Sequence, residues 1–172
     1  MTTAPLDARR LAQLAARYSL PPDSLVALAR VVVQGDRELM VEPGAVLCSQ
    51  NEPADALYLL VDGALRVRRR DRRNEMKDIA TAVAPAVLGH MALVLHQRRT
   101  AALVGGTEGA RVISLSKAQV EWLLDGHTAE ADALRRLMLA AQLDQHQRSV
   151  TDILRKLDAS TPLPKGWAPV KD

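Results

Sequence analysis

The fold is decided by residues 41–67, VEPGAVLCSQNEPADALYLLVDGALRV, in which short apolar runs alternate with turn residues. The runs Val46–Cys48 and Ala56–Val61 are too short for helices of ordinary length and suit strands. Pro43-Gly44 and Asp62-Gly63 are dipeptides typical of tight turns. This spacing predicts an antiparallel sandwich or barrel, and not alternating strand and helix units.

Further short apolar runs follow this stretch, at 79–83, 101–104 and 110–115. Turn residues separate the runs, and we interpret Gly105-Gly106 as a turn between the last two. Apolar residues return to helical spacing before and after the strand region. The order of elements is therefore helices, strands, helices.

We predict an α+β protein, an antiparallel β-roll (a double-stranded β-helix, jelly-roll-like) with N-terminal helices and a long C-terminal helix. The N-terminal helices are expected in 1–37 and the roll in 38–128. The long helix is expected over 129–157, and a proline-rich tail over 158–172.

The composition is that of an ordinary globular domain. The chain has 172 residues, of which 48% are hydrophobic, so it can bury one core but is too short for two ordinary domains plus a linker. The single cysteine, Cys48, cannot form an internal disulfide, and no signal-peptide pattern opens the chain, so we expect a cytoplasmic protein. The apolar runs are far shorter than the roughly 20 residues that cross a bilayer, so no membrane span is expected.

Two segments carry a resemblance to a known family. Residues 41–67 resemble the opening strands of the cyclic-nucleotide-binding domain, with Gly63 at a tight turn between two strands. GHMALVLHQRRTAAL, at 89–103, is similar to that family's phosphate-binding cassette, which here spans 85–103 and which joins a Gly-Glu-x-Ala-Leu segment to an Arg-Ser/Thr-Ala segment. The resemblance covers about 38–157, and it implies a sensor domain like that of catabolite activators, with cAMP or cGMP as the ligand.

The cassette has a physical rationale. A guanidinium meets a phosphodiester with two parallel charge-assisted hydrogen bonds, and Arg99 is the candidate for this contact. Gly89 permits a close turn before a short helix, whose first backbone N–H groups add donors. The candidate ligand-binding residues are Gly89, His90, Met91, Ala92, Arg99, Thr100 and Ala101.

The sequence departs from the family's pattern at three places. His90 occupies the position of the family's glutamate, which accepts a hydrogen bond from the ribose 2′-hydroxyl, and an imidazole becomes a pure donor when it is protonated. Three interpretations stay open: His90 keeps one weaker bond to the sugar, helps to hold a different anion, or marks a degenerate pocket. Pro85-Ala86 replaces a frequent Gly-Asp, and proline holds a turn only at negative φ. Asn51 replaces a glycine, and asparagine enters the left-handed region readily, so we expect the turn to be retained.

The long C-terminal helix is expected to have two apolar stripes, in 134–141 and 150–157, with a polar stretch between them. The resemblance implies a homodimer through this helix, whereas the polar stretch suits either base recognition or a water-facing segment. Only 158–172 follow, which is too short for a helix-turn-helix, so we do not expect DNA binding. We expect the output to pass through the dimer or a partner protein. Trp167 in this tail suits docking on a partner or on the domain itself.

The arginine-rich stretch RVRRRDRR, at 66–73, has two interpretations. It is either a solvated strand face that protects an exposed edge or an electrostatic docking surface for an acidic protein, an anionic lipid or a nucleic acid.

No His-Glu-x-x-His pair, Walker loop or Gly-x-Ser-x-Gly elbow occurs, so we expect neither an enzyme nor a metal site. Two functions remain: a ligand sensor, favoured by Arg99-Thr100-Ala101, and a ligand-free interaction scaffold, favoured by His90.

Overall fold

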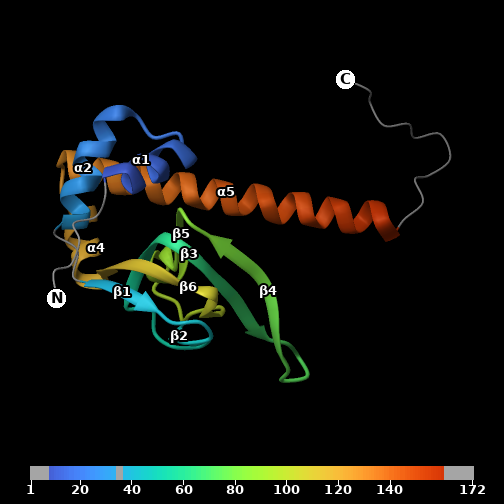
Figure 1. Ribbon diagram of the computed structural model, residues 1–172. Helices are drawn as coiled ribbons and strands as arrows, with labels where there is room; N and C mark the ends of the chain where they lie inside the picture. Colours follow the sequence, from blue (N-terminus) through green and yellow to red (C-terminus); the bar gives the residue numbers. More distant parts are fainter. Residues whose placement is uncertain (1–7, 34–36, 161–172) are drawn as a thin grey trace, which may run out of the picture.

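The computed structural model describes residues 8–33 and 37–160 (Figure 1). Its helices and strands, in chain order, are α1 (Ala8–Arg17), α2 (Pro22–Val33), β1 (Arg37–Val41), β2 (Val46–Cys48), β3 (Ala56–Arg70), β4 (Met76–Val83), β5 (Ala86–Leu88), α3 (His90–Val94), β6 (Ala102–Ser116), α4 (Lys117–Asp125) and α5 (Ala129–Ser160). Helix α5 therefore continues three residues beyond the expected end at Leu157. Trp167 and the rest of the tail lie outside the described residues.

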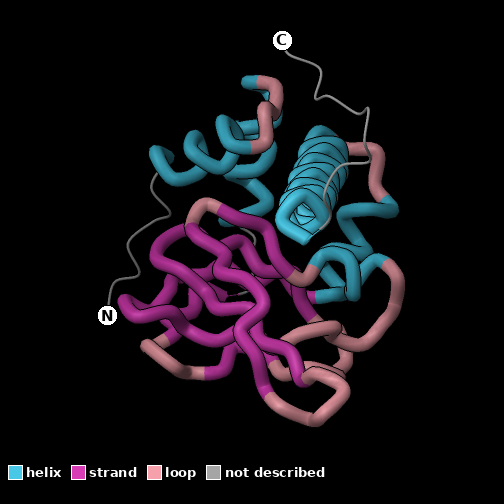
Figure 2. The backbone as a smooth tube through the Cα atoms, turned by 90° about the vertical axis from the view of Figure 1, so that its right-hand side faces the viewer, coloured by secondary structure: helices cyan, strands magenta, loops and turns pink. Residues whose placement is uncertain are grey.

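The strands form one antiparallel sheet in the order β1-β6-β3-β4, with β2 paired to β6 and β5 paired to β3. Figures 1 and 2 show the strands on one side of the molecule and helices α1, α2 and α5 on the other. The predicted α+β fold, an antiparallel roll between N-terminal helices and a long C-terminal helix, is confirmed.

Two predicted turns are wrong. Gly63 and Gly105-Gly106 lie inside strands, because β3 and β6 each continue for 15 residues and pair with one another along most of their length. A Cβ atom on Gly105 would collide with the carbonyl oxygen of Glu42, so this glycine permits a close approach of backbones. Gly63 has a φ of +73° and lies at a register shift, which bends the long strand without ending it.

Strand β3 is buried on both faces near its start, which explains its uninterrupted apolar run. Leu57 and Leu59 pack in the core that the sheet shares with the helices. Tyr58 and Leu60 belong to two smaller clusters within the roll. Alternate residues of a strand point to opposite faces, so one short segment holds the helical layer and the roll together.

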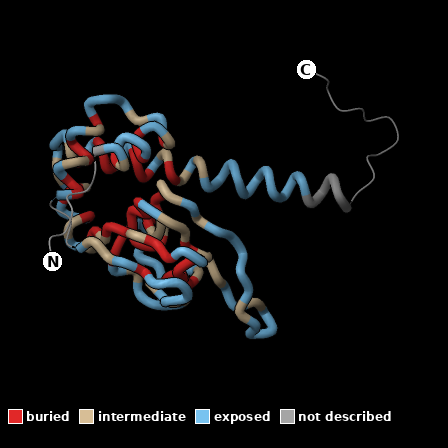
Figure 3. Tube along the Cα trace, viewed as in Figure 1, coloured by how far each residue is buried: buried red, intermediate tan, exposed pale blue. Residues whose placement is uncertain are grey.

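Helix α5 has two unlike halves (Figure 3). Its first half carries buried residues, including Leu134 and Leu137, and packs against α2 and α4. Its second half extends beyond the body of the domain and leaves its large apolar residues exposed, among them Val150, Ile153 and Leu154.

Candidate functional site

The predicted cassette is built on the edge of the roll. Strand β5 pairs with Tyr58–Leu60 of β3, and the chain then turns at Gly89 into the five-residue helix α3. Gly89 has a φ of +77°, and a Cβ atom there would collide with Nη1 of Arg99. Both the backbone conformation and the close approach of the guanidinium therefore require glycine at this position.

Arg99 is buried in the wall of the cassette, with only 3% of its surface exposed. Its Nη1 donates to the carbonyl oxygen of Gly89 at 3.1 Å, and its Nη2 donates to the carbonyl oxygen of Ala56 at 2.6 Å. Nη2 also lies 3.3 Å from a carboxylate oxygen of Asp55, and the guanidinium lies over the ring of Tyr58 at 5.1 Å. These contacts fix the orientation of the positive charge.

The backbone of Arg99 is held as firmly as its side chain. Its N–H donates to the carbonyl oxygen of Glu52, and its own carbonyl oxygen accepts from the N–H of Asn51, each at 2.8 Å. Asn51 has a φ of +70°, so the predicted left-handed turn is confirmed. The Nε atom of Arg99 is buried and has no hydrogen-bond partner among the described residues, so this N–H donor remains unused.

A cleft of about 840 Å³ opens between the cassette, β4 and α5. The cassette contributes every candidate ligand-binding residue predicted from the sequence: Gly89, His90, Met91, Ala92, Arg99, Thr100 and Ala101. Cys48, Val67 and Leu103 line the same cleft from neighbouring strands, and Asp144, Arg148 and Thr151 are among the residues that line it from α5.

Arg99 is the buried positive charge of this cleft. Burial raises the pKa of the Cys48 thiol and of the Tyr58 hydroxyl, although the charge of Arg99 opposes this rise, so both groups stay neutral at pH 7. The carboxylate of Asp55 is 80% exposed, so water screens its attraction for Arg99. A buried guanidinium without a buried counter-ion suits an anionic ligand.

His90, the first residue of α3, is 4% exposed and joins the cassette to α5. Its Nε2 lies 3.2 Å from Oε1 of Gln142, and its Nδ1 is buried without a partner among the described residues. Burial lowers the pKa of His90 more than the hydrogen bond to Gln142 raises it, so the imidazole is neutral at pH 7.

The last residue of helix α1 and the residue that follows it support the segment that leads into the cassette, a role that the sequence patterns did not show. The hydroxyl of Tyr18 accepts a hydrogen bond from the N–H of Val87 at 3.1 Å. Arg17 donates to the carbonyl oxygens of Val83 and Pro85. These contacts join residues 66 to 69 positions apart, so no local motif predicts them.

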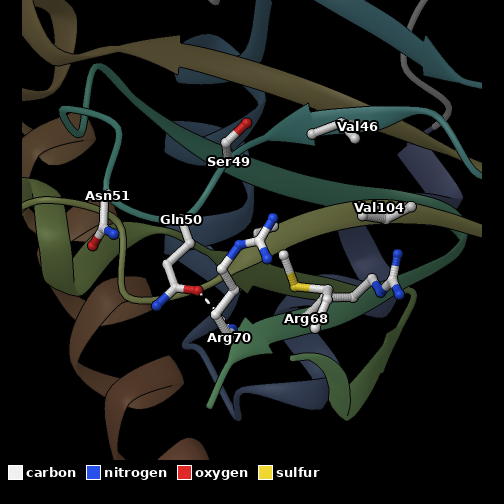
Figure 4. A pocket seen from close by; sticks show the side chains of 9 residues that line it. Val46, Ser49, Gln50, Asn51, Arg68, Arg70 and Val104 are labelled. Atoms are coloured by element: carbon white, nitrogen blue, oxygen red, sulfur yellow. Dashed lines mark hydrogen bonds between the residues drawn. The ribbon is translucent and has the colours of Figure 1, made fainter. Parts of the chain in front are cut away.

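The arginine-rich stretch 66–73 lies on another face of the roll. Arg66 and Arg68 both lie within ion-pair distance of Asp78 on β4, while Val67 between them lines the cleft. Arg68 and Arg70 line a separate hollow of about 330 Å³, where the backbone N–H of Arg70 donates to Gln50 (Figure 4). Several of these arginines are thus held by neighbours on the same hairpin.

Within residues 8–33 and 37–160, no group of three or more histidine, cysteine or acidic side chains is placed to hold a metal ion. No helix in this described part of the chain has the length and apolar character needed to cross a membrane.

Known proteins share this fold. A cyclic nucleotide-binding domain from Methylobacillus flagellatus superposes with a TM-score of 0.73 at 17% identity, over 93% of this chain and 86% of that one. The catabolite activator protein of Thermus thermophilus superposes with a TM-score of 0.60 at 20% identity, over 81% of this chain and 61% of that one. These identities are low, so the superpositions show the fold alone.

The sequence also matches the DNA integrity scanning protein DisA of Acidothermus cellulolyticus, with 34% identity over 141 residues. That match covers 76% of this chain and 35% of DisA, so the chain spans about a third of the length of that relative. The profile of the cyclic nucleotide-binding domain matches residues 38–127, which is more than half of the chain. The protein therefore belongs to the cyclic nucleotide-binding domain family.

Proposed function

We propose that this protein is a regulatory sensor domain, which binds a cyclic nucleotide such as cAMP or cGMP, or a related anionic ligand, between the cassette and α5. The observation that carries the proposal is the buried guanidinium of Arg99 in the wall of a cleft of about 840 Å³. Burying a charge costs free energy unless a partner compensates for it. The phosphate of a ligand supplies that compensation.

The cassette offers further donors to a phosphate. The backbone N–H groups of Met91 and Ala92 belong to the first turn of α3, where N–H groups have no partner within the helix. Thr100 adds an exposed hydroxyl, and Ala101 leaves space beside it. The ligand's base then faces the polar residues of α5 that line the cleft, such as Gln145 and Thr151.

The signal leaves the domain through α5, which lines the cleft and continues beyond the body of the domain. We propose that a second copy of the chain covers the exposed apolar residues of this helix, which gives a homodimer, and that a partner protein reads the dimer. Leu143 and Val150 are both exposed and lie seven residues apart, which is the repeat of a two-helix seam. Ligand binding shifts α5 only by as much as the ligand's affinity differs between the two positions.

Isothermal titration calorimetry of the full chain with cAMP, cGMP and cyclic dinucleotides tests the proposal. The wild type is expected to bind one of these ligands, and Arg99→Ala is expected to abolish the heat of binding. Arg69→Ala removes an equal charge at an exposed position outside the cleft, so it serves as the control and is expected to bind normally. Unchanged binding by Arg99→Ala would refute the role of the cassette.

A second candidate function is a ligand-free interaction scaffold. The contacts of Arg99 with Gly89, Ala56 and Asp55 favour it, because the protein itself already uses most of the guanidinium's donors. The histidine at position 90 also replaces the acceptor that the family uses for the ribose. In this case no ligand produces heat, and Arg99→Ala lowers the free energy of unfolding without affecting any binding.

A further inference from the structure

The positive charge of the chain is concentrated in the hairpin of β3 and β4. Residues 66–78 contain seven basic and three acidic side chains, so their net charge is +4, whereas the whole chain has a net charge of +3. Figure 1 shows this hairpin projecting from the roll on the side away from helices α1 and α2. The hairpin therefore presents its positive charge away from the body of the domain.

Most arginines of the hairpin lack an acidic partner. The three acidic side chains of the hairpin lie within ion-pair distance of Arg66, Arg68 and Lys77. The guanidinium of Arg70 donates only to the backbone carbonyl of Asn74, which carries no charge. The exposed arginines of the hairpin without an ion pair among the described residues are Arg69, Arg70, Arg72 and Arg73. Their charges are available to a partner.

Protection of the sheet edge does not explain these arginines. The strand order places β4 at the edge, whereas β3 is paired with β4 on one side and, as far as Arg68, with β6 on the other. Beyond Arg68, Gln50 accepts a hydrogen bond from the N–H of Arg70. Charges that protect an edge are expected on the strand with unpaired backbone groups, yet β4 has one basic residue, Lys77. We therefore interpret the arginine-rich stretch as an interaction surface.

A hollow of about 330 Å³ lies beside the unpaired arginines (Figure 4). Its apolar lining, which we call the floor, consists of Val46, Met76, Ala102 and Val104. Its polar lining consists of Ser49, Gln50, Asn51, Arg68 and Arg70. Val67 and Leu103, which alternate with these residues along β3 and β6, line the cleft instead. The hollow therefore opens on the opposite face of the sheet from the cleft.

The hollow and the arginines together select the chemistry of a partner. A large apolar side chain is the usual anchor of a protein interface, and the floor of the hollow suits one. Carboxylates meet guanidinium groups with two parallel hydrogen bonds. A nucleic acid brings phosphates but no aliphatic side chain, and a membrane surface is too broad to enter a hollow of this size. An acidic protein segment supplies both groups.

We propose that this face of the β3–β4 hairpin binds an acidic segment of a partner protein, with one large apolar side chain in the hollow and carboxylates beside Arg70, Arg72 and Arg73. The interaction does not require a ligand in the cleft. The hollow and the cleft share no lining residue, so the docking surface and the sensor function stand or fall separately.

Fluorescence anisotropy of a labelled peptide tests the inference on the full chain. The probe is a short fluorescein-labelled peptide in which one leucine is flanked by glutamates, and it is expected to bind saturably. Replacing its leucine with serine is expected to weaken binding by about tenfold or more, as the burial of one leucine side chain predicts. Replacing its glutamates with glutamines is expected to abolish binding. Salt at about 1 M shortens the Debye length to about 3 Å and is expected to weaken the interaction strongly.

Matched variants locate the binding surface. Arg73→Glu is expected to weaken binding by about threefold or more, whereas Arg136→Glu makes the same change of charge at an exposed position on α5 and is expected to bind normally. Val46 is 60% exposed, and Val46→Ser is expected to weaken the leucine peptide but not the serine peptide. Val83→Ser is the control, because Val83 is 58% exposed on β4 outside the hollow. Equal losses in Arg73→Glu and Arg136→Glu would overturn the inference.

Duplex DNA and phosphatidylserine vesicles distinguish the other classes of partner. Tighter binding of either one than of the leucine peptide overturns the inference, as does the absence of saturable peptide binding or equal binding of the leucine and serine peptides. Each of these results leaves the sensor function intact. Conversely, calorimetry that finds no cyclic nucleotide ligand refutes the sensor function and leaves the docking surface intact.

Discussion

Replacing Gly89 with alanine tests whether the guanidinium of Arg99 is held directly beneath the cassette turn. The substitution adds one methyl group at a φ of +77°, where it would collide with Nη1 of Arg99. The left-handed backbone alone costs an alanine about 1–2 kcal/mol. Displacing the guanidinium breaks at least one charge-assisted hydrogen bond, to Gly89 or Ala56, which adds about 1.5–3 kcal/mol. The expected loss in the free energy of unfolding is therefore about 2.5–5 kcal/mol.

Gly44 provides a matched control for this variant. It has the same φ of +77°, but a Cβ atom there meets nothing within 4 Å, so Gly44→Ala is expected to cost only the backbone contribution of about 1–2 kcal/mol. In an Arg99→Ala background, Gly89→Ala is expected to cost no more than Gly44→Ala. Urea denaturation followed by far-UV circular dichroism measures the free energy of unfolding of the wild type, Gly89→Ala, Gly44→Ala, Arg99→Ala and the double variant Gly89→Ala/Arg99→Ala. If Gly89→Ala costs no more than Gly44→Ala in the wild-type background, the guanidinium does not occupy the place described.

Three further predictions concern His90, the hydrogen bond between Tyr18 and Val87, and the exposed apolar residues of α5. The pKa of His90 is lower in the folded protein than its unfolded value of about 6.5, so the unfolded state binds more protons below that pH. The free energy of unfolding is therefore expected to fall on acidification from pH 6.5, by at most about 1.4 kcal/mol per pH unit. Urea titrations at several pH values measure this slope, and His90→Leu is expected to flatten it. Tyr18→Phe leaves the N–H of Val87 without its acceptor and is expected to cost about 1–3 kcal/mol in the same assay, whereas an unchanged midpoint would show that water replaces the hydroxyl. Leu143→Lys is expected to dissociate the proposed dimer in sedimentation equilibrium, and a wild type that is already monomeric at micromolar concentration contradicts the seam on α5.

The local features of the cassette could be read from the sequence because each depends on residues close together in the chain. Gly89 and Asn51 signal left-handed turns by residue type, and Arg99 follows the short helix at a fixed distance. All seven candidate residues line one cleft for the same reason.

The wrong turns at Gly63 and Gly105-Gly106 have a different cause. A glycine in a strand that needs a bulge or a close contact has the same local pattern as a glycine in a turn. Only contacts with distant parts of the chain distinguish the two, and the carbonyl oxygen that crowds Gly105 belongs to Glu42, which is 63 residues away in the chain. The link between His90 and Gln142 spans 52 residues and was equally invisible to local patterns, although Gln142 belongs to the polar stretch already noted.

The place where α5 leaves the core limits how the proposed ligand could move it. Ala141 is the last buried residue of α5 among the described side chains, and residues 145–155 are all exposed, so the helix leaves the core close to Gln142. The first half cannot shift as a unit without opening the packed cluster around Leu134 and Leu137, which costs far more than a small ligand's difference in affinity supplies. If the proposed ligand moves α5, the movement is therefore expected in the half of the helix beyond Gln142. That half lines the cleft and carries the exposed apolar residues, so in the proposed sensor the ligand and the second copy of the chain both contact this segment.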